Sequence, residues 1–206
     1  MVKIKICGIT NKEDAFLATD LGADALGFVF APSPRQIAPV EAKKIIKSLP
    51  PFIDRVGVFV NEEPSRVREI LNFCCLTTLQ FHGDESPSYC QGFPCKIIKS
   101  FPIKDKVPDS ILNYSVDAYL LDTFCQDKRG GTGRVFDWEL AKQVKKFGLP
   151  LILSGGLTPE NVSEAIRKVR PYAVDAASGL EETPGKKSKK KLKEFIKRAR
   201  EEDEIL

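Results

Sequence analysis

Short apolar runs alternate along the chain with longer stretches whose apolar residues recur at helical spacing. The short runs predict strands at residues 4–7, 25–30, 55–60, 78–81, 96–100, 118–122, 151–154 and 173–176. The stretches between and after them predict helices at residues 12–21, 39–48, 64–73, 86–91, 106–113, 138–147, 159–169 and 188–200. Strand and helix units of this kind use almost the whole chain.

Proline and capping residues mark several predicted helix starts. Thr158 places a capping hydroxyl before Pro159, and Pro39 and Pro64 stand at similar points. Strands joined through helices pair in parallel with right-handed crossovers, and eight such units close naturally into a (β/α)₈ TIM barrel. An open doubly wound sheet is the alternative. No shift in composition divides residues 1–206, so we expect a single barrel domain.

Two glycine turns follow the last two predicted strands. The sequence SGGLTPEN places Gly155 and Gly156 after the seventh strand, and AASGLE places Ser178 and Gly179 after the eighth. Glycine lets an anion approach the backbone without a Cβ clash, and a helix start presents free N–H groups. Turns after strands seven and eight form the usual phosphate site of this barrel, so we expect a phosphorylated small-molecule substrate.

Cys7 ends the first predicted strand, where active-site residues of a barrel gather. Lys3, Lys5 and Cys7 share one face of this alternating strand, and the strand alone does not decide whether that face points to solvent or into the barrel. A buried cysteine is often only a small apolar side chain, whereas a thiolate can act as a base. Gly8 gives a thiol at the rim clearance, which favours the second interpretation.

Asp122 ends the sixth predicted strand, directly after an apolar run. A carboxylate at this point must be hydrated, paired or used in chemistry, and capping the following loop is its structural alternative. Cys7 and Asp122 on distant strands of one rim form a candidate base and acid acting on opposite sides of a substrate.

The composition is typical of a soluble globular protein, with 42% hydrophobic residues and no apolar run long enough to cross a membrane. No secretory signal pattern begins the chain, so we expect a cytoplasmic protein without a membrane partner. Its six cysteines include no C-x-x-C pair and predict reduced thiols. His82 is the single histidine, which excludes a multi-histidine site, and we expect no bound metal.

Much of the net charge of +4 lies near the C-terminus. The lysines of this stretch are Lys186, Lys187, Lys189, Lys190, Lys191 and Lys193. Such a run can bind nucleic acid or an acidic partner. Apolar residues recur among these lysines at helical spacing, at Leu192, Phe195, Ile196 and Ala199. We therefore expect the solvated face of a last helix and no nucleic-acid partner.

The longest irregular stretch, residues 123–136, follows the sixth strand and has a glycine-rich centre at residues 128–133. Long loops in compact domains are often lids over a site, which predicts a lid here.

Several short motifs, taken together and in order, point to one family. They are KICGIT at 5–10, GADALGFVF at 22–30, SPR at 33–35, GVFVNE at 57–62, QFHG at 80–83, LLDT at 120–123, GGTG at 130–133, FDW at 136–138, SGGLTPENV at 154–162 and PGKK at 184–187. The set spans nearly the whole chain and resembles the phosphoribosylanthranilate isomerase family of tryptophan biosynthesis.

The resemblance implies an Amadori rearrangement of N-(5′-phosphoribosyl)anthranilate to 1-(o-carboxyphenylamino)-1-deoxyribulose 5-phosphate, without metal or organic cofactor. It also implies that Cys7 is the general base and Asp122 the general acid. A protonated Asp122 would donate to the furanose ring oxygen and open the sugar to a Schiff base. The Cys7 thiolate would then take the C2′ proton, leaving an enolamine that becomes the ketone.

Further substrate contacts follow from the same resemblance. Arg35 is similar to the family's partner of the anthranilate carboxylate, which a guanidinium can bind bidentately. Asp175 is similar to an aspartate that faces the substrate, with a structural hydrogen bond as the alternative, and His82 is either a structural residue or a substrate contact. The phosphate would be held through the backbone amides of Gly155, Gly156, Ser178 and Gly179.

The sequence departs from the family pattern in two places. Gln36 stands where a basic or aromatic residue is common, and Ala176-Ala177 replace the usual valine and serine. We expect the first to alter loop docking over the substrate ring. The second removes one hydroxyl near the phosphate and weakens binding at most, since backbone amides remain.

Two other functions are compatible with the residues alone. Another phosphosugar aldose–ketose isomerase on this barrel would ignore the anthranilate ring, so Arg35 distinguishes it. A noncatalytic phosphate-binding barrel would dispense with Cys7 and Asp122. Both a monomer and a homodimer suit the architecture.

Overall fold

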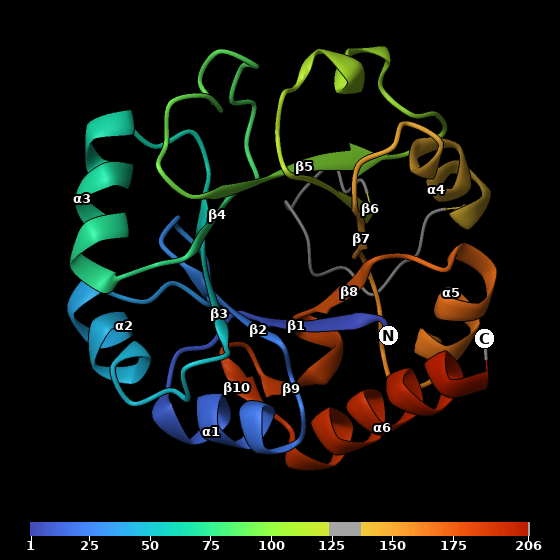
Figure 1. The fold of residues 1–206 in the computed structure, drawn as a ribbon. Coiled ribbons are helices and arrows are strands. Elements are labelled where there is room, and N and C mark those ends of the chain that lie inside the picture. The colour runs from blue at the N-terminus through green and yellow to red at the C-terminus, as the bar shows by residue number, and fades with distance from the viewer. Residues whose placement is uncertain (124–136, 206) are drawn as a thin grey trace.

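Eight parallel strands close into a barrel in the computed structural model, which describes residues 1–123 and 137–205. The strands are β1 (Lys3–Cys7), β2 (Ala25–Val29), β3 (Asp54–Phe59), β4 (Thr78–Phe81), β5 (Lys96–Ile103), β6 (Ala118–Thr123), β7 (Leu151–Leu153) and β8 (Ala173–Ala176). Each strand pairs with the next, and β8 pairs with β1 (Figure 1). Lys5 lies opposite Asp175 in the β1–β8 pair. This closure confirms the predicted (β/α)₈ barrel and excludes the open sheet.

Helices surround the barrel on its outside (Figure 1). They are α1 (Lys12–Asp20), α2 (Pro39–Ile46), α3 (Pro64–Cys74), α4 (Trp138–Lys145), α5 (Val162–Val169) and α6 (Lys189–Ile205). Pro39 and Pro64 open α2 and α3 as the sequence predicted, because a first-turn proline lacks only an N–H that the helix does not use. Asn11 caps α1 by accepting from the Asp14 N–H at 2.8 Å.

The helix predicted at residues 86–91 is wrong, because this segment forms turns. Its start signal is present, since the Ser86 hydroxyl accepts from the Tyr89 N–H at 3.2 Å. Gly92 then leaves the helical conformation at a φ of +75°. The segment therefore ends before a second helical turn forms.

Two other helices begin three residues later than predicted. Residues 106–113 contribute only a 3₁₀ helix, η1 (Asp109–Asn113), because Pro108 lacks an N–H and disfavours helical backbone before it. Helix α5 begins at Val162 and not at Pro159. Thr158 and Asn161 form a separate turn instead, in which the Thr158 N–H donates to Asn161 Oδ1 at 2.8 Å.

The chain between β8 and α6 forms elements that the sequence did not predict. A 3₁₀ helix, η2 (Ser178–Leu180), leads into a hairpin of β9 (Glu181–Thr183) and β10 (Lys186–Lys187). The hairpin docks on the segment after β1, where the Thr10 hydroxyl donates to the Gly185 carbonyl and the Lys187 N–H donates to Asp14 Oδ2 at 2.8 Å. Residues far apart in sequence thus meet beside Cys7.

The barrel interior combines a small apolar cluster with buried charge. The cluster consists of Val56, Ile98, Ala118, Leu120, Ile152 and Ala173. Lys5 is only 3% exposed and pairs with Asp175 on the neighbouring strand. The lysine face of β1 therefore points into the barrel at Lys5, which settles the question left open by the strand pattern.

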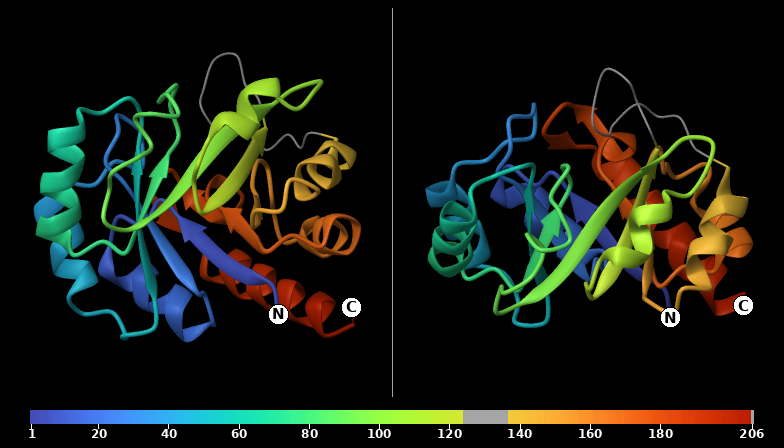
Figure 2. Two further views of the ribbon diagram at one scale, coloured as in Figure 1. Left: turned by 45° about the horizontal axis from the view of Figure 1, so that its top comes forward. Right: turned by 90° about the horizontal axis from the view of Figure 1, so that it is seen from above.

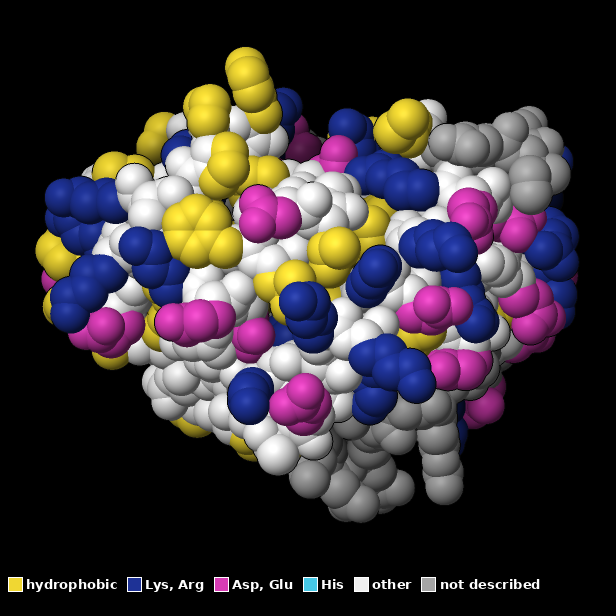
Figure 3. Space-filling model, turned by 90° about the horizontal axis from the view of Figure 1, so that it is seen from below, with side chains coloured by type: hydrophobic (Ala, Val, Ile, Leu, Met, Phe, Trp, Pro, Cys, Tyr) yellow, Lys and Arg dark blue, Asp and Glu magenta, His cyan; other side chains and the backbone are white. Residues whose placement is uncertain are grey.

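Helix α6 lies along the outside of the barrel beside the start of β1, where Arg200 Nη1 donates to the Val2 carbonyl at 2.6 Å, and both termini lie on the same side of the molecule (Figure 2). Its predicted apolar face is buried, at Leu192, Phe195, Ile196 and Ala199. The lysines on its other face are exposed, as predicted, at Lys189, Lys190, Lys191 and Lys193. On the face seen in Figure 3, acidic and basic side chains are interspersed. None of the described helices is long and apolar enough to cross a membrane.

Candidate active site

Four consecutive strands of the barrel, β6, β7, β8 and β1, carry the predicted chemistry at their C-terminal ends. In barrel order the residues are Asp122 near the end of β6, Gly155 and Gly156 after β7, Ser178 and Gly179 after β8, and Cys7 at the end of β1. The acid and the thiol therefore flank two glycine turns along one arc of the same rim.

The Cys7 thiol occupies space left by a glycine on the next strand. Gly27 pairs with Cys7 across β1 and β2, and a Cβ on Gly27 would lie 2.7 Å from Cys7 Sγ. Cys7 is 8% exposed, and this burial raises the pKa of its thiol above the ordinary value. The positive charge of Lys5 opposes that effect and lowers the thiol pKa.

Lys5 and Asp175 form a buried pair beside this thiol. Lys5 Nζ lies 2.9 Å from Asp175 Oδ1, and the positive charge of Lys5 lowers the pKa of the Cys7 thiol. Burial by itself lowers the pKa of Lys5, but Asp175 and Cys7 raise it by more, so the ammonium keeps its charge. The second Asp175 oxygen accepts from Ser154 Oγ at 3.4 Å. Both side-chain oxygens of Asp175 therefore accept hydrogen bonds from other side chains.

Asp122 is 6% exposed and held by two groups. Its Oδ1 accepts from the Thr123 N–H at 2.8 Å, and its Oδ2 lies 3.2 Å from His82 Nε2. His82 Nδ1 lies 3.0 Å from the side-chain amide nitrogen of Gln80. His82 thereby connects the end of β4 to the predicted acid across the barrel mouth.

The two glycine turns pack directly on each other and on Asp122. Gly155 and Gly156 have φ values of +84° and +71°, which favour glycine. A Cβ on Gly155 would overlap the Thr123 backbone and lie 2.8 Å from Asp122 Oδ1, and one on Gly179 would overlap the Leu157 carbonyl. Glycine at these positions therefore lets the β6, β7 and β8 ends approach closely.

Arg35 lies on the loop after β2 and reaches the hairpin. Its Nε and Nη2 donate to the two carboxylate oxygens of Glu181 at 2.8 and 2.7 Å. The stem of Arg35 crosses Gly8, since a Cβ there would lie 2.6 Å from Arg35 Cδ, and Gly8 has a φ of +75°. Arg35 thus comes to lie next to the strand end that carries Cys7.

The prediction that the C-terminal lysines are all solvated is wrong at Lys187. It is 2% exposed, and its Nζ donates to the Cys7 carbonyl at 2.6 Å, the Ala177 carbonyl at 3.1 Å and Glu181 at 3.0 Å. Burial lowers the pKa of Lys187, and the charge of Glu181 opposes that shift. Lys187 belongs to β10 and not to α6, and its side chain contacts the Cys7 carbonyl and not solvent.

Comparison with known proteins agrees with this geometry. Residues 4–198 match the family model described as N-(5′phosphoribosyl)anthranilate (PRA) isomerase. The chain belongs to this family. It is 49% identical over 203 residues to an N-(5′-phosphoribosyl)anthranilate isomerase of Trichlorobacter lovleyi, covering 98% of this chain and 99% of that relative.

Solved structures of the PRA isomerase family have the same barrel. The phosphoribosyl anthranilate isomerase of Thermotoga maritima matches with a TM-score of 0.92 at 45% identity, over 98% of this chain and 100% of that one. Another family structure holds reduced 1-(o-carboxyphenylamino)-1-deoxyribulose 5-phosphate, and it matches with a TM-score of 0.88 at 44% identity over 98% and 100% of the two chains. The predicted family and fold are therefore confirmed.

Three further residues near the candidate site of this PRA isomerase family member were not predicted from the sequence. Lys5, Glu181 and Lys187 are all buried at the rim or just beneath it. The alternation of β1 signalled only that Lys5 shares a face with Cys7, and PGKK signalled Lys187 only as part of a motif. Nothing in the sequence indicated that Glu181 pairs with Arg35.

Gln36, one of the residues that depart from the family pattern, contacts the end of β2 and the residue after it. Its side-chain amide donates to the Phe30 carbonyl at 3.3 Å, and Gln36 bridges to Val29 at the end of β2. Gln36 therefore closes the loop that carries Arg35.

The predicted lid centre at residues 128–133 lies outside the described residues.

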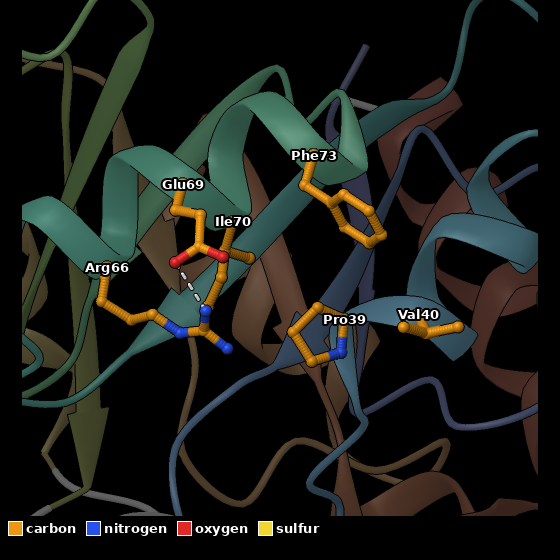
Figure 4. A pocket seen from close by; sticks show the side chains of 6 residues that line it. All are labelled: Pro39, Val40, Arg66, Glu69, Ile70 and Phe73. Carbon is orange, nitrogen blue, oxygen red and sulfur yellow. Dashed lines mark hydrogen bonds and ion pairs between the residues drawn. The ribbon is translucent and has the colours of Figure 1, made fainter.

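A groove of about 180 Å³ lies elsewhere, on the outer layer between α2 and α3 (Figure 4). It is lined by Pro39, Val40, Arg66, Glu69, Ile70 and Phe73. None of the predicted site residues lines it, so its position argues against a part in the rim chemistry. Among residues 1–123 and 137–205, no three His, Cys, Asp or Glu side chains are grouped so as to hold a metal ion.

Proposed function

We propose that the chain converts N-(5′-phosphoribosyl)anthranilate to 1-(o-carboxyphenylamino)-1-deoxyribulose 5-phosphate in tryptophan biosynthesis. Membership of the family supports this activity. The observation that carries it is the arc of consecutive strands β6, β7, β8 and β1, which presents Asp122, two glycine turns and Cys7 in that order. A phosphate held at the turns would lie between an acid and a thiol.

Asp122 opens the sugar in this proposal. Its carboxyl group, protonated when substrate arrives, donates to the furanose ring oxygen, and the C1′–O bond breaks to give a protonated Schiff base. The Thr123 N–H and His82 each hold one oxygen of Asp122, at 2.8 and 3.2 Å. These contacts fix the direction of the carboxyl group, which assigns His82 a positioning role.

Cys7 then acts as the base. Its thiolate takes the C2′ proton, and the electron pair moves to the Schiff base to form an enolamine. The enolamine becomes the ketone when C1′ gains a proton and the C2′ hydroxyl loses one. Because burial raises the pKa of Cys7, the resting group is the thiol, and the thiolate forms against that tendency. The Lys5 ammonium favours the thiolate, and Asp175 keeps Lys5 in place.

The remaining residues bind the substrate. Backbone amides of Gly155, Gly156, Ser178 and Gly179 receive the phosphate, supported by the packing of the two turns on one another. Arg35 receives the anthranilate carboxylate. We assign Asp175 to the pairing with Lys5, which supports its structural interpretation over direct substrate contact.

Turnover of purified protein tests the assignment. Loss of phosphoribosylanthranilate fluorescence follows the reaction directly. We expect Cys7→Ser and Asp122→Asn each to lower kcat by at least about 10²-fold, the usual contribution of a general acid or base. Both substitutions nearly preserve side-chain volume, so the fold should remain.

Matched controls use exposed residues of the same types. Cys75→Ser and Asp109→Asn lie on exposed positions and should leave turnover unchanged. Unchanged turnover in both Cys7→Ser and Asp122→Asn would overturn the acid and base assignment. A folded wild type that leaves this substrate untouched but isomerises another phosphosugar would favour the alternative isomerase.

The cytoplasmic location and the choice between monomer and homodimer stay predictions from the sequence. We propose that the partner at the site is the phosphorylated small molecule alone, with no nucleic acid. Sedimentation of the purified chain would give the oligomeric state.

A further inference from the structure

A cluster of two cations and one carboxylate lies beside the proposed base, where Lys187 donates to the Cys7 carbonyl. It consists of Arg35, Glu181 and Lys187. We propose that Glu181 and Lys187 are positioning residues that hold Arg35 so that it meets the substrate carboxylate through Nη1. This inference rests on the proposed function, because it concerns how that substrate is recognised.

The hydrogen bonds of Arg35 decide the direction of approach. Glu181 takes Nε and Nη2 with both of its oxygens, at 2.8 and 2.7 Å, which is the side-on bidentate arrangement. A second carboxylate cannot use the same edge of the guanidinium. The end formed by Nη1 and the other hydrogen of Nη2 remains for a ligand, so the substrate carboxylate must bind end-on.

Lys187 fixes Glu181 in turn. Its side chain is fully buried, and it donates to Glu181 Oε1 at 3.0 Å, the oxygen that also accepts from Arg35 Nε. The same ammonium donates to the Cys7 carbonyl at 2.6 Å. The carboxylate-binding guanidinium is thereby connected through two side chains to the backbone of the proposed base.

The cluster has a net positive charge, which favours binding of one further anion. Arg35 and Lys187 contribute two positive charges and Glu181 one negative charge. Burial alone would raise the pKa of Glu181, but Arg35 and Lys187 lower it overall, so it stays ionised. One net positive charge therefore faces the rim, and a substrate carboxylate at Nη1 would neutralise it.

A purely structural role is the competing explanation, since these contacts also anchor the β9–β10 hairpin. The two explanations differ in what a variant should affect. Positioning of Arg35 concerns the ligand carboxylate alone, whereas anchoring of the hairpin concerns every ligand of the site. Two ligands that differ only in that carboxylate separate them.

The test measures dissociation constants for reduced 1-(o-carboxyphenylamino)-1-deoxyribulose 5-phosphate and for the same compound without the ring carboxylate. We expect the wild type to prefer the carboxylated ligand. In Glu181→Gln this preference should fall about tenfold, because an amide cannot accept from both donors and a charge-assisted hydrogen bond is lost. Affinity for the ligand without the carboxylate should change less than about twofold.

Glu182→Gln is the matched control, because Glu182 neighbours Glu181 on the hairpin but is exposed and pairs with Lys186 on the surface. It should leave both affinities unchanged. Glu181→Asp, which keeps the charge on a shorter stem, replaces Glu181→Gln if that variant does not fold, and it should also lower the preference.

Three results would overturn the inference. These are an equal loss of affinity for both ligands, an unchanged preference in the Glu181 variants, and a wild type that shows no preference. Wild-type turnover of phosphoribosylanthranilate, measured separately, decides the proposed function. An active enzyme with an unchanged preference would thus refute the positioning role and leave the function standing.

Discussion

Two buried lysine–carboxylate pairs, whose lysines lie on the barrel strands β1 and β5, look alike in distance and burial. Lys5 Nζ lies 2.9 Å from Asp175, and Lys99 Nζ lies 3.0 Å from Glu85. The side chains of both pairs are at most 6% exposed. They differ in what else surrounds the ammonium.

Lys99 on β5 is surrounded by fold contacts. Besides Glu85, its Nζ donates to the Gly83 carbonyl at 2.8 Å and approaches the Phe81 carbonyl at 3.4 Å. Glu85 accepts from the Asn61 and Gly83 N–H groups at 2.8 and 2.9 Å. This pair therefore ties the loops after β3 and β4 to the barrel.

Lys5 lies instead near the thiol that we propose as the base. Its Nζ donates to Asp175 at 2.9 Å, and its positive charge lowers the pKa of the Cys7 thiol. The difference between the pairs is thus in their third partner, which is backbone for Lys99 and a thiol for Lys5. Burial and ion pairing alone do not separate a structural charge from a chemical one.

The largest effect should come from breaking the structural pair. Lys99→Met leaves Glu85 buried without its cation, and we expect a loss of about 3–5 kcal/mol in the free energy of unfolding. Denaturant titration measures it. Lys106→Met, at an exposed position, should change stability by less than about 0.5 kcal/mol. A Lys99 variant as stable as this control would refute the structural role.

A smaller effect should separate Lys5 from Lys99. In Lys5→Met combined with Asp175→Asn, no buried charge is left alone. The thiol pKa should rise, because the influence of Lys5 on Cys7 exceeds that of Asp175. We expect turnover near neutral pH to fall roughly tenfold, the effect of losing one charge-assisted interaction with the thiolate.

Alkylation of Cys7 by iodoacetamide, followed by mass spectrometry across pH, measures the thiol titration in this double variant. Its midpoint should move to higher pH than in the wild type. Lys99→Met, studied under conditions where it is folded, should leave the midpoint in place. A shift of equal size in both would remove the distinction between the two pairs.

The smallest effect concerns a third buried pair, Lys187–Glu181. The pKa of Glu181 is lowered in the folded state, so its contribution to stability is present above its ordinary value of 4.5 and is lost as pH falls below it. Between pH 5 and pH 3, wild-type stability should therefore decline more steeply than that of Glu181→Gln. Denaturant titrations at these pH values compare the slopes, and parallel declines would contradict the lowered pKa.

The strands were predicted well because strands buried on both faces read as continuous apolar runs between helical patterns. Helix boundaries were less predictable, since they depended on local competition. Gly92 stopped a helix that Ser86 had started, and a separate turn at Thr158 delayed α5. The hairpin at residues 181–187 gave no periodic signal because its strands are too short.

Within the site, the sequence could place residues that end strands, since the barrel fixes where strand ends meet. Cys7 and Asp122 required no more than that. The pairing of Arg35 with Glu181, and the burial of Lys187 within a run of exposed lysines, depend on how two loops fold against each other. Periodicity cannot report contacts between such distant segments.

The assignment of Cys7 as base and Asp122 as acid is tested most directly by a kinetic isotope effect. The measurement compares kcat/KM for phosphoribosylanthranilate with and without deuterium at C2′. Cys7→Ser weakens the base, so C2′ proton removal should limit its residual rate and the isotope effect should exceed that of the wild type. Asp122→Asn weakens ring opening, which precedes that step, so the isotope effect should nearly vanish. Equal isotope effects in the two variants, or the reverse order, would contradict the assignment of base and acid.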